Sequence, residues 1–192
     1  MKKSNICLIF LNLIFTFFFA ASLLEAAVIQ GAISSKSGSD ISAGEFVIQL
    51  RKLNPETGVF LYLTSIGVGP ETNYKYSFND LETGAYLLSC QDLSGAFALQ
   101  YYGGSSFQEK AKKVKLTVED QVSEVNFQLA DGRALGGQLV DQSGNPVSDM
   151  NISVFALDKN NNNNHFYITG LPTDENGEWL VGVPAGRYKI LF

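Results

Sequence analysis

The sequence predicts an all-β protein made of two tandem β-sandwich units that follow an N-terminal targeting segment. Three observations lead to this fold class. Beyond residue 27, apolar and polar residues alternate with period two in many short runs, which is typical of strands with one solvent-facing side. No run of ten or more residues there combines helical spacing with capping residues. Turn-forming residues separate the runs, and the motifs of the first part of the chain recur in the second.

The N-terminal segment, residues 1–27, has the organisation of a secretory signal peptide. Lys2 and Lys3 precede an apolar run that starts at Ile6, and small residues close the segment. We expect cleavage within those small residues. Extended to Leu24, the apolar run reaches 19 residues, so an uncleaved membrane anchor is the alternative.

Composition narrows the function classes. The 45% of hydrophobic and 12% of aromatic residues argue against a disordered chain. With 14 Lys and Arg against 19 Asp and Glu, the net charge is −5, and without a basic stripe we expect no nucleic-acid partner. One histidine and two cysteines exclude a His-rich metal site, a four-cysteine zinc site and a dense disulfide framework.

The same inventory argues against catalysis. Cys90 is the only cysteine after the targeting segment, so no intramolecular disulfide is expected, and we predict a buried thiol. His165 is the only histidine, and it follows an asparagine run at 160–164 with no nucleophile motif beside it. We therefore expect no enzyme activity, no cofactor and no metal.

The first set of strands precedes a break at Asp131 and Gly132. Its last member shows the pattern well, since Val125, Phe127 and Leu129 alternate with polar residues. Each such strand has one buried and one solvent-facing side. The expected strands are 28–34, 46–52, 60–67, 74–79, 84–92, 113–118 and 124–129.

The second set follows the break, which we take as the boundary between a unit at 28–131 and a unit at 132–192. Gly144 and Pro146 mark a turn between two of its strands. Such regular strands and turns indicate sandwiches rather than a parallel sheet. The expected strands are 135–140, 151–157, 165–169, 178–183 and 186–192.

The two sets overlay as degenerate copies of one module. Both begin with a glycine-containing strand, and both contain a Gly-x-Tyr step after a strand. Gly31 matches Gly137 and Ile48 matches Val154 at a shift of 106 residues, and 81–86 matches 183–188 at a shift of 102. The difference of four residues between the two shifts is what changes in loop length produce.

The second copy resembles the carboxypeptidase regulatory-like domain, a transthyretin-like (immunoglobulin-like) β-sandwich; the first copy keeps 81–86 but lacks a Gly-x-Pro turn near residue 40. The resemblance implies a non-catalytic module of extracellular or surface proteins, used for spacing, stabilisation or binding. A module of this family continues past such a final strand, so it also implies a module truncated at Phe192. The residues that carry it are 137–141, 144–147, 152–155, 173–174, 177–179 and 183–188.

Tyr101 and Tyr102 are the candidate ligand contacts. They stand beside a glycine pair in a loop-like stretch, where a ring could stack on a sugar or a protein partner. The alternative is a loop that packs on the edge of the sandwich. We expect the other aromatics that suggest sugar binding, Tyr86, Trp179 and Tyr188, to lie in the core.

Two charged segments have plainer interpretations. Asp174, Asn176 and Glu178 are spaced like the first ligands of a calcium loop, but the twelfth position is Ala185, so we expect a hairpin turn. Four lysines within 110–115 could form an anion-binding patch, and a solvated face is the commoner outcome.

These observations favour a secreted or surface-displayed, non-enzymatic protein that serves as a structural or interaction element. One alternative is a carbohydrate-binding module, and another is the N-terminal accessory region of a larger exported enzyme such as a peptidase. The expected partner is a protein or a polysaccharide. Contact with a membrane is expected only if residues 1–27 are retained.

Overall fold

The computed structural model describes residues 27–117, 122–158 and 165–192, so the predicted signal segment before Ala27 and the asparagine run at 160–164 lie outside the described residues. Within the described ranges, every regular element is a strand apart from two single 3-10 turns. The predicted all-β class is confirmed. In this part of the chain no helix is long and apolar enough to cross a membrane.

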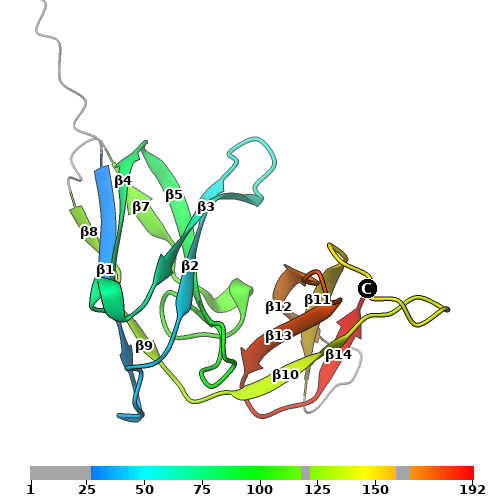
Figure 1. The fold of residues 1–192 in the computed structure, drawn as a ribbon. Coiled ribbons are helices and arrows are strands. Elements are labelled where there is room, and N and C mark those ends of the chain that lie inside the picture. Colours follow the sequence, from blue (N-terminus) through cyan, green and yellow to red (C-terminus); the bar gives the residue numbers. More distant parts are fainter. Residues whose placement is uncertain (1–26, 118–121, 159–164) are drawn as a thin grey trace, which may run out of the picture.

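The first half of the molecule, residues 27–131, forms two facing sheets (Figure 1). One sheet has the order β4-β1-β8, with β9 also on β1, and the other has the order β3-β2-β5-β6, with β7 on β5. The elements are β1 Ala27–Ser35, β2 Phe46–Leu53, β3 Phe60–Val68, η1 Pro70–Thr72, β4 Lys75–Leu81, β5 Gly84–Asp92, β6 Gln100–Tyr101, η2 Gln108–Lys110, β7 Val114–Leu116, β8 Val122–Glu124 and β9 Phe127–Leu129.

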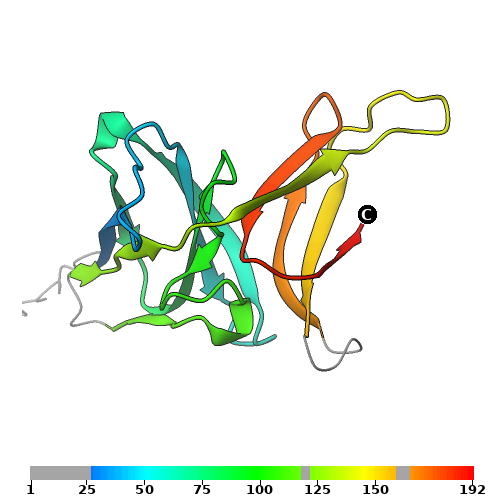
Figure 2. The same ribbon diagram turned by 90° about the horizontal axis from the view of Figure 1, so that it is seen from below.

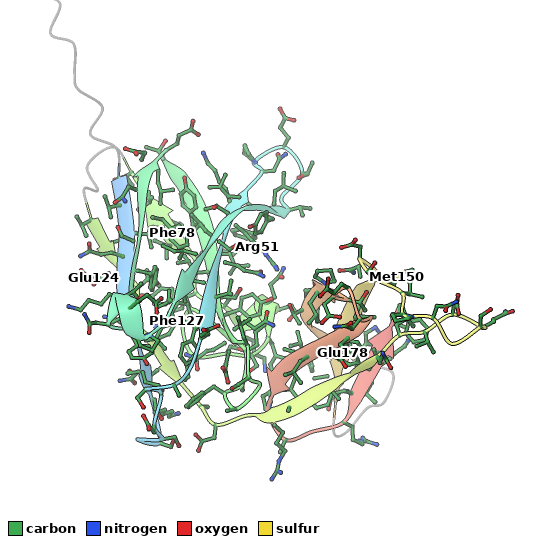
Figure 3. The ribbon with its side chains drawn as sticks, in the orientation of Figure 1. Arg51, Phe78, Glu124, Phe127, Met150 and Glu178 are labelled. Carbon is green, nitrogen blue, oxygen red and sulfur yellow. The ribbon has the colours of Figure 1, made fainter. Side chains whose placement is uncertain are left out.

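The core of the first half lies between these sheets and follows the alternation of the sequence. Ile48 and Leu50 of β2 are fully buried, and Phe78 and Phe127 point into the space between the sheets (Figure 3). The ring of Tyr76 packs edge-on against Phe78, with 5.8 Å between centroids. Each large apolar side chain buried in this way contributes about 1.5–3 kcal/mol.

The second half, residues 132–192, repeats the strand pairing of the first on a smaller scale. β10 pairs with β13 as β1 pairs with β4, and the order β12-β11-β14 corresponds to β3-β2-β5. Figure 2 shows the halves side by side, joined by the segment between β9 and β10. The elements are β10 Arg133–Gln138, β11 Asn151–Leu157, β12 His165–Pro172, β13 Glu178–Val183 and β14 Tyr188–Leu191.

A tyrosine hydrogen bond recurs at equivalent places in both halves. The hydroxyl of Tyr86 donates to the carbonyl oxygen of Glu82 at 2.7 Å. The hydroxyl of Tyr188 donates to the carbonyl oxygen of Pro184, also four residues earlier. Both residues of the second pair follow those of the first by the 102-residue shift of the sequence overlay. The same local geometry therefore supports the repeat.

The expected strand 124–129 is divided in two. Its apolar residues Val125, Phe127 and Leu129 are all buried as predicted, but β8 and β9 are separate, and each pairs with β1 in parallel. Between them the side chain of Asn126 accepts a hydrogen bond from the backbone N–H of Ala32 at 2.8 Å. A side-chain oxygen therefore takes the place of a backbone carbonyl oxygen at this point, and the hydrogen-bonded pairing with β1 is interrupted between β8 and β9.

Candidate functional site

Tyr101 lies inside the molecule, at the contact between the two halves. Its side chain is 1% exposed, and its hydroxyl donates to the carbonyl oxygen of Ile168 in β12 at 2.8 Å. Burial raises the pKa of Tyr101 to about 12. No ring face of Tyr101 is therefore open to a ligand. This placement agrees with the alternative interpretation, in which the loop packs on the sandwich.

Tyr102 takes a different position from its neighbour. It is half-buried and packs against the core of the first half, and its backbone N–H donates to the carbonyl oxygen of Leu88 at 2.9 Å. A ligand-contact role stays a prediction for Tyr102, whose side chain is partly exposed.

The segment around Tyr101 contributes to the core of the second half. Leu87 and Leu99, both 2% exposed, belong with Tyr101 to the hydrophobic cluster that includes Val181. The backbone N–H of Leu99 donates to the carbonyl oxygen of Gly182 at 2.8 Å, so this segment also extends the hydrogen bonding of β13. The halves are thus joined by a shared apolar core and by backbone hydrogen bonds.

A buried carboxylate shapes the loop that makes this contact. Asp92 is 2% exposed, and its carboxylate accepts hydrogen bonds from the backbone N–H of Phe97 at 2.9 Å and from Ser94. A buried carboxylate is tolerated when such donors satisfy it. The network holds the loop against the second half, where Gly132 donates its N–H to the carbonyl oxygen of Ala96 at 2.7 Å.

The turn η2 adds a polar and an aromatic contact. A guanidinium N–H of Arg51 in β2 donates to the side-chain oxygen of Gln108 at 2.8 Å, and Figure 3 shows Arg51 on the side of the first half that faces the second. The rings of Phe107 and Phe166 pack with their centroids 5.3 Å apart. The ammonium of Lys110 lies 5.3 Å and 5.5 Å from these two ring centroids.

A cavity of about 470 Å³ opens next to this aromatic pair. Phe107 and Phe166 supply apolar surface, and Tyr188 adds a third ring. Charges of both signs line the cavity, from Lys110, Arg187 and Asp158. Sites for small ligands combine such apolar walls with a few polar groups, often between packed units. Local sequence patterns could not reveal this cavity, because its lining comes from both halves.

The other residues singled out in the sequence have structural roles. Asp174 accepts hydrogen bonds from the backbone N–H groups of Asn176 and Glu178, both at 2.8 Å, which confirms the hairpin turn. Cys90 is completely buried, as predicted, and burial raises the pKa of its thiol. His165 is exposed and packs edge-on against Phe155, with 5.3 Å between the ring centroids.

The remaining aromatic predictions hold in part. Tyr86 is fully buried, whereas Trp179 and Tyr188 are partly buried and pack against the core of the second half. Among the described residues, no group of three His, Cys, Asp or Glu side chains could hold a metal ion.

Comparison with known proteins gives distant structural likenesses. No family model and no curated protein matches the chain. A streptococcal ancillary pilin is similar over 86% of this chain and 53% of its own, with 10% identity and a TM-score of 0.40. A shaft pilin of Lactobacillus rhamnosus GG covers 87% and 86%, with 8% identity and a TM-score of 0.31.

A single B repeat unit of the collagen-binding surface protein of Staphylococcus aureus covers 86% of this chain and 83% of its own, with 11% identity and a TM-score of 0.31. The chain spans about half the length of the ancillary pilin. At these identities and TM-scores no residue role is transferred to this chain. The carboxypeptidase regulatory-like assignment stays a prediction.

Proposed function

We propose that this protein is a non-catalytic structural or interaction element that is exported to the cell surface or the medium. In this proposal it consists of two carboxypeptidase regulatory-like modules, at 28–131 and 132–192, that behave as one stiff unit. The contact centred on Tyr101 is the observation that carries it. A side chain that the sequence offers as a candidate ligand contact is used instead to hold the two halves together.

The shared core explains why a stiff unit is expected. Leu87, Leu99 and Tyr101 belong to the first half by sequence but to the core of the second by contact. Separating the halves would expose these three side chains, and each costs about 1.5–3 kcal/mol to expose. Independent motion of the halves is therefore unfavourable, which suits a spacer or a rigid display element.

Replacing the ring at the contact tests this coupling. We expect the protein to unfold in a single calorimetric transition, and Tyr101→Ala to lower its stability by about 3–5 kcal/mol and split the transition in two. Tyr62→Ala is the matched control, because Tyr62 is 62% exposed. A single, unshifted transition in Tyr101→Ala would contradict a coupled pair of modules.

Export is tested by fractionation of the producing cells. We expect the chain in the medium or accessible to protease on intact cells, with the positive n-region and apolar run removed from its N-terminus. Mass spectrometry of the recovered chain gives the cleavage position. Recovery in the cytoplasm with an intact N-terminus would reject the exported role.

A carbohydrate-binding role is the second candidate, and the cavity beside Phe107 and Phe166 favours it. A sugar ring could stack on these aromatic surfaces, with the ammonium of Lys110 beside them. Binding to a polysaccharide panel that disappears in Phe166→Ala, and survives in Tyr62→Ala, would support it. Tyr102→Ala tests the sequence-based expectation separately, and an absence of binding to every glycan rejects this role.

A further inference from the structure

Strand β1, the first strand of the described chain, is held on both of its sides. It pairs antiparallel with β4 from Ala27 onward and in parallel with β8 from Val28 onward. Figure 1 shows its first residues between these two strands, at the end of the first half where β4 turns into β5. The polypeptide is therefore fixed within the sheet from the first residue of β1.

Ala27 itself belongs to the core of the first half. It is 3% exposed, and it lies in the same hydrophobic cluster as Leu81 and Leu116. Ile29, the next inward-facing residue of β1, is fully buried. A chain that lacked Ala27 would lose one of the buried side chains at this end of the sandwich.

A bulge in β4 keeps Ala27 in register with its partner. Ile29 pairs with Phe78. Ala27 pairs with Leu81, so between these two pairs β4 has one residue more than β1. Asp80 lies in this bulge with a φ of 57°, a left-handed conformation that aspartate adopts more often than most residues. Because bulges of this kind are regular features of a fold rather than defects, the pairing at Ala27 is part of the native structure.

Small residues near the end of the predicted signal segment offer several bonds for cleavage. These are the bonds after Ala20, Ala21, Ser22, Ala26 and Ala27. Signal peptidase, the protease that removes such segments, takes small residues at the first and third positions before the bond that it cuts. A cut after Ser22 meets this requirement, because Ala20 stands at the third position. At the other cuts the third position holds a larger residue, namely Phe18, Phe19, Leu24 or Glu25.

The structure argues independently against the two latest cuts. A new N-terminus carries a charged amino group, and a charge beside buried apolar side chains is unfavourable. A cut after Ala26 would put this group on Ala27 itself, and a cut after Ala27 would remove that buried residue from β1. A cut after Ser22 separates the amino group from Ala27 by four residues.

We propose that the exported chain is cut after Ser22 and begins at Leu23. Water hydrolyses the peptide bond between these two residues, which leaves a carboxyl group on Ser22 and an amino group on Leu23. Residues 23–26 then separate the new charge from Ala27. The inference rests on the proposed export, which it deepens by naming the processing site and the class of enzyme that acts there.

The N-terminus of the exported chain tests the proposed site in the producing cells. We expect N-terminal sequencing and intact mass to give a single start at Leu23. Ala20→Gln should lower the amount of chain with this start at least about tenfold, because a larger side chain would stand at the third position before the bond. Ala26→Gln is the matched control, and it should be cut after Ser22 as the unmodified chain is.

Purified chains with different first residues test the role of Ala27. They are produced without the signal segment, from fusions whose removal leaves no additional residue, and they start at Leu23, Ala27 or Val28. We expect the highest Tm for the Leu23 start. The Val28 start should melt about 2–4 °C lower, because it lacks a buried residue and carries its charge within β1. The Tm of the Ala27 start should lie between these two values.

Several results would overturn the proposed site. They are an exported chain that starts at Ala27 or Val28, a displayed chain that keeps residues 1–22, normal cleavage of Ala20→Gln after Ser22, or equal Tm values for the three starts. An exported chain with another N-terminus contradicts the cleavage site alone. Recovery in the cytoplasm with an intact N-terminus rejects export itself, so the two failures are distinguishable.

Discussion

The two halves of the molecule share their strand pairing and differ in how each sandwich is closed. In each half a pair of strands faces a set of three strands, and in each half a tyrosine at the start of the last shared strand donates to a carbonyl oxygen four residues earlier. The first half adds β7, β8 and β9, and Ile29 and Ile33 of its strand β1 are buried. In the second half the residues equivalent to them at the 106-residue shift, Leu135 and Leu139, are half-buried. Equivalent residues thus contribute unequally to stability, because burial depends on the strands that cover them.

The largest expected effect is at the covering strand of the first half. Phe127→Ala removes a fully buried ring and should lower the free energy of unfolding by about 3–5 kcal/mol. Leu139→Ala, in the second half, should cost about 1 kcal/mol, because the side chain of Leu139 already contacts solvent. Urea denaturation monitored by circular dichroism measures both values. Equal losses of stability at the two positions would show that the side chains of Phe127 and Leu139 are buried to the same degree.

The repeated tyrosine gives a smaller and more direct comparison. Tyr86→Phe removes a hydrogen bond from a side chain that is 1% exposed, and should cost about 1 kcal/mol. Tyr188→Phe should cost less, about 0.5 kcal/mol, because water can replace its partner in the half-exposed site. Thermal unfolding of the two variants in parallel tests the order. A larger loss of stability in Tyr188→Phe than in Tyr86→Phe would contradict the expectation that the more buried hydrogen bond contributes more.

The smallest effect is electrostatic and lies in the first half. Lys52 donates to the Glu82 carboxylate, and this ion pair lowers the pKa of Glu82 and raises that of Lys52. A lowered carboxylate pKa stabilises the fold above the ordinary value of 4.5, and the contribution is lost as the pH falls through the lowered pKa. We expect Glu82→Gln to be slightly less stable at pH 7 and equal to the unmodified protein at pH 2.

Because Glu82 lies at the surface, salt should weaken this effect. Denaturant midpoints at pH 7, measured in low and high salt, check that dependence. The counterpart of Glu82 is Pro184, so the second half should show no matching titration. A stability difference that persists at pH 2 would assign the effect of Glu82→Gln to packing.

Local patterns were sufficient for most strands but insufficient for the candidate site. The alternation of Val125, Phe127 and Leu129 predicted which side chains are buried, and the turn at Asp174 formed as expected. The short strand β6 was not predicted, and the sequence left open whether Tyr101 packs on the sandwich or faces a ligand. Strand β6 depends on pairing with β5, and the burial of Tyr101 depends on contact with Ile168 of β12, 67 residues away in the sequence. A tyrosine beside two glycines has the same local pattern whether it packs inside or faces solvent.

Period-two alternation and turn residues are local properties, so the printed residues are enough to specify an all-β chain with a repeated module, and the scarcity of His and Cys limits its chemistry. The joining of the halves through Tyr101 and the parallel pairing of β8 and β9 with β1 are tertiary. They follow from which distant surfaces meet. Burial and sheet hydrogen bonding depend on those long-range contacts, and a local pattern does not contain them.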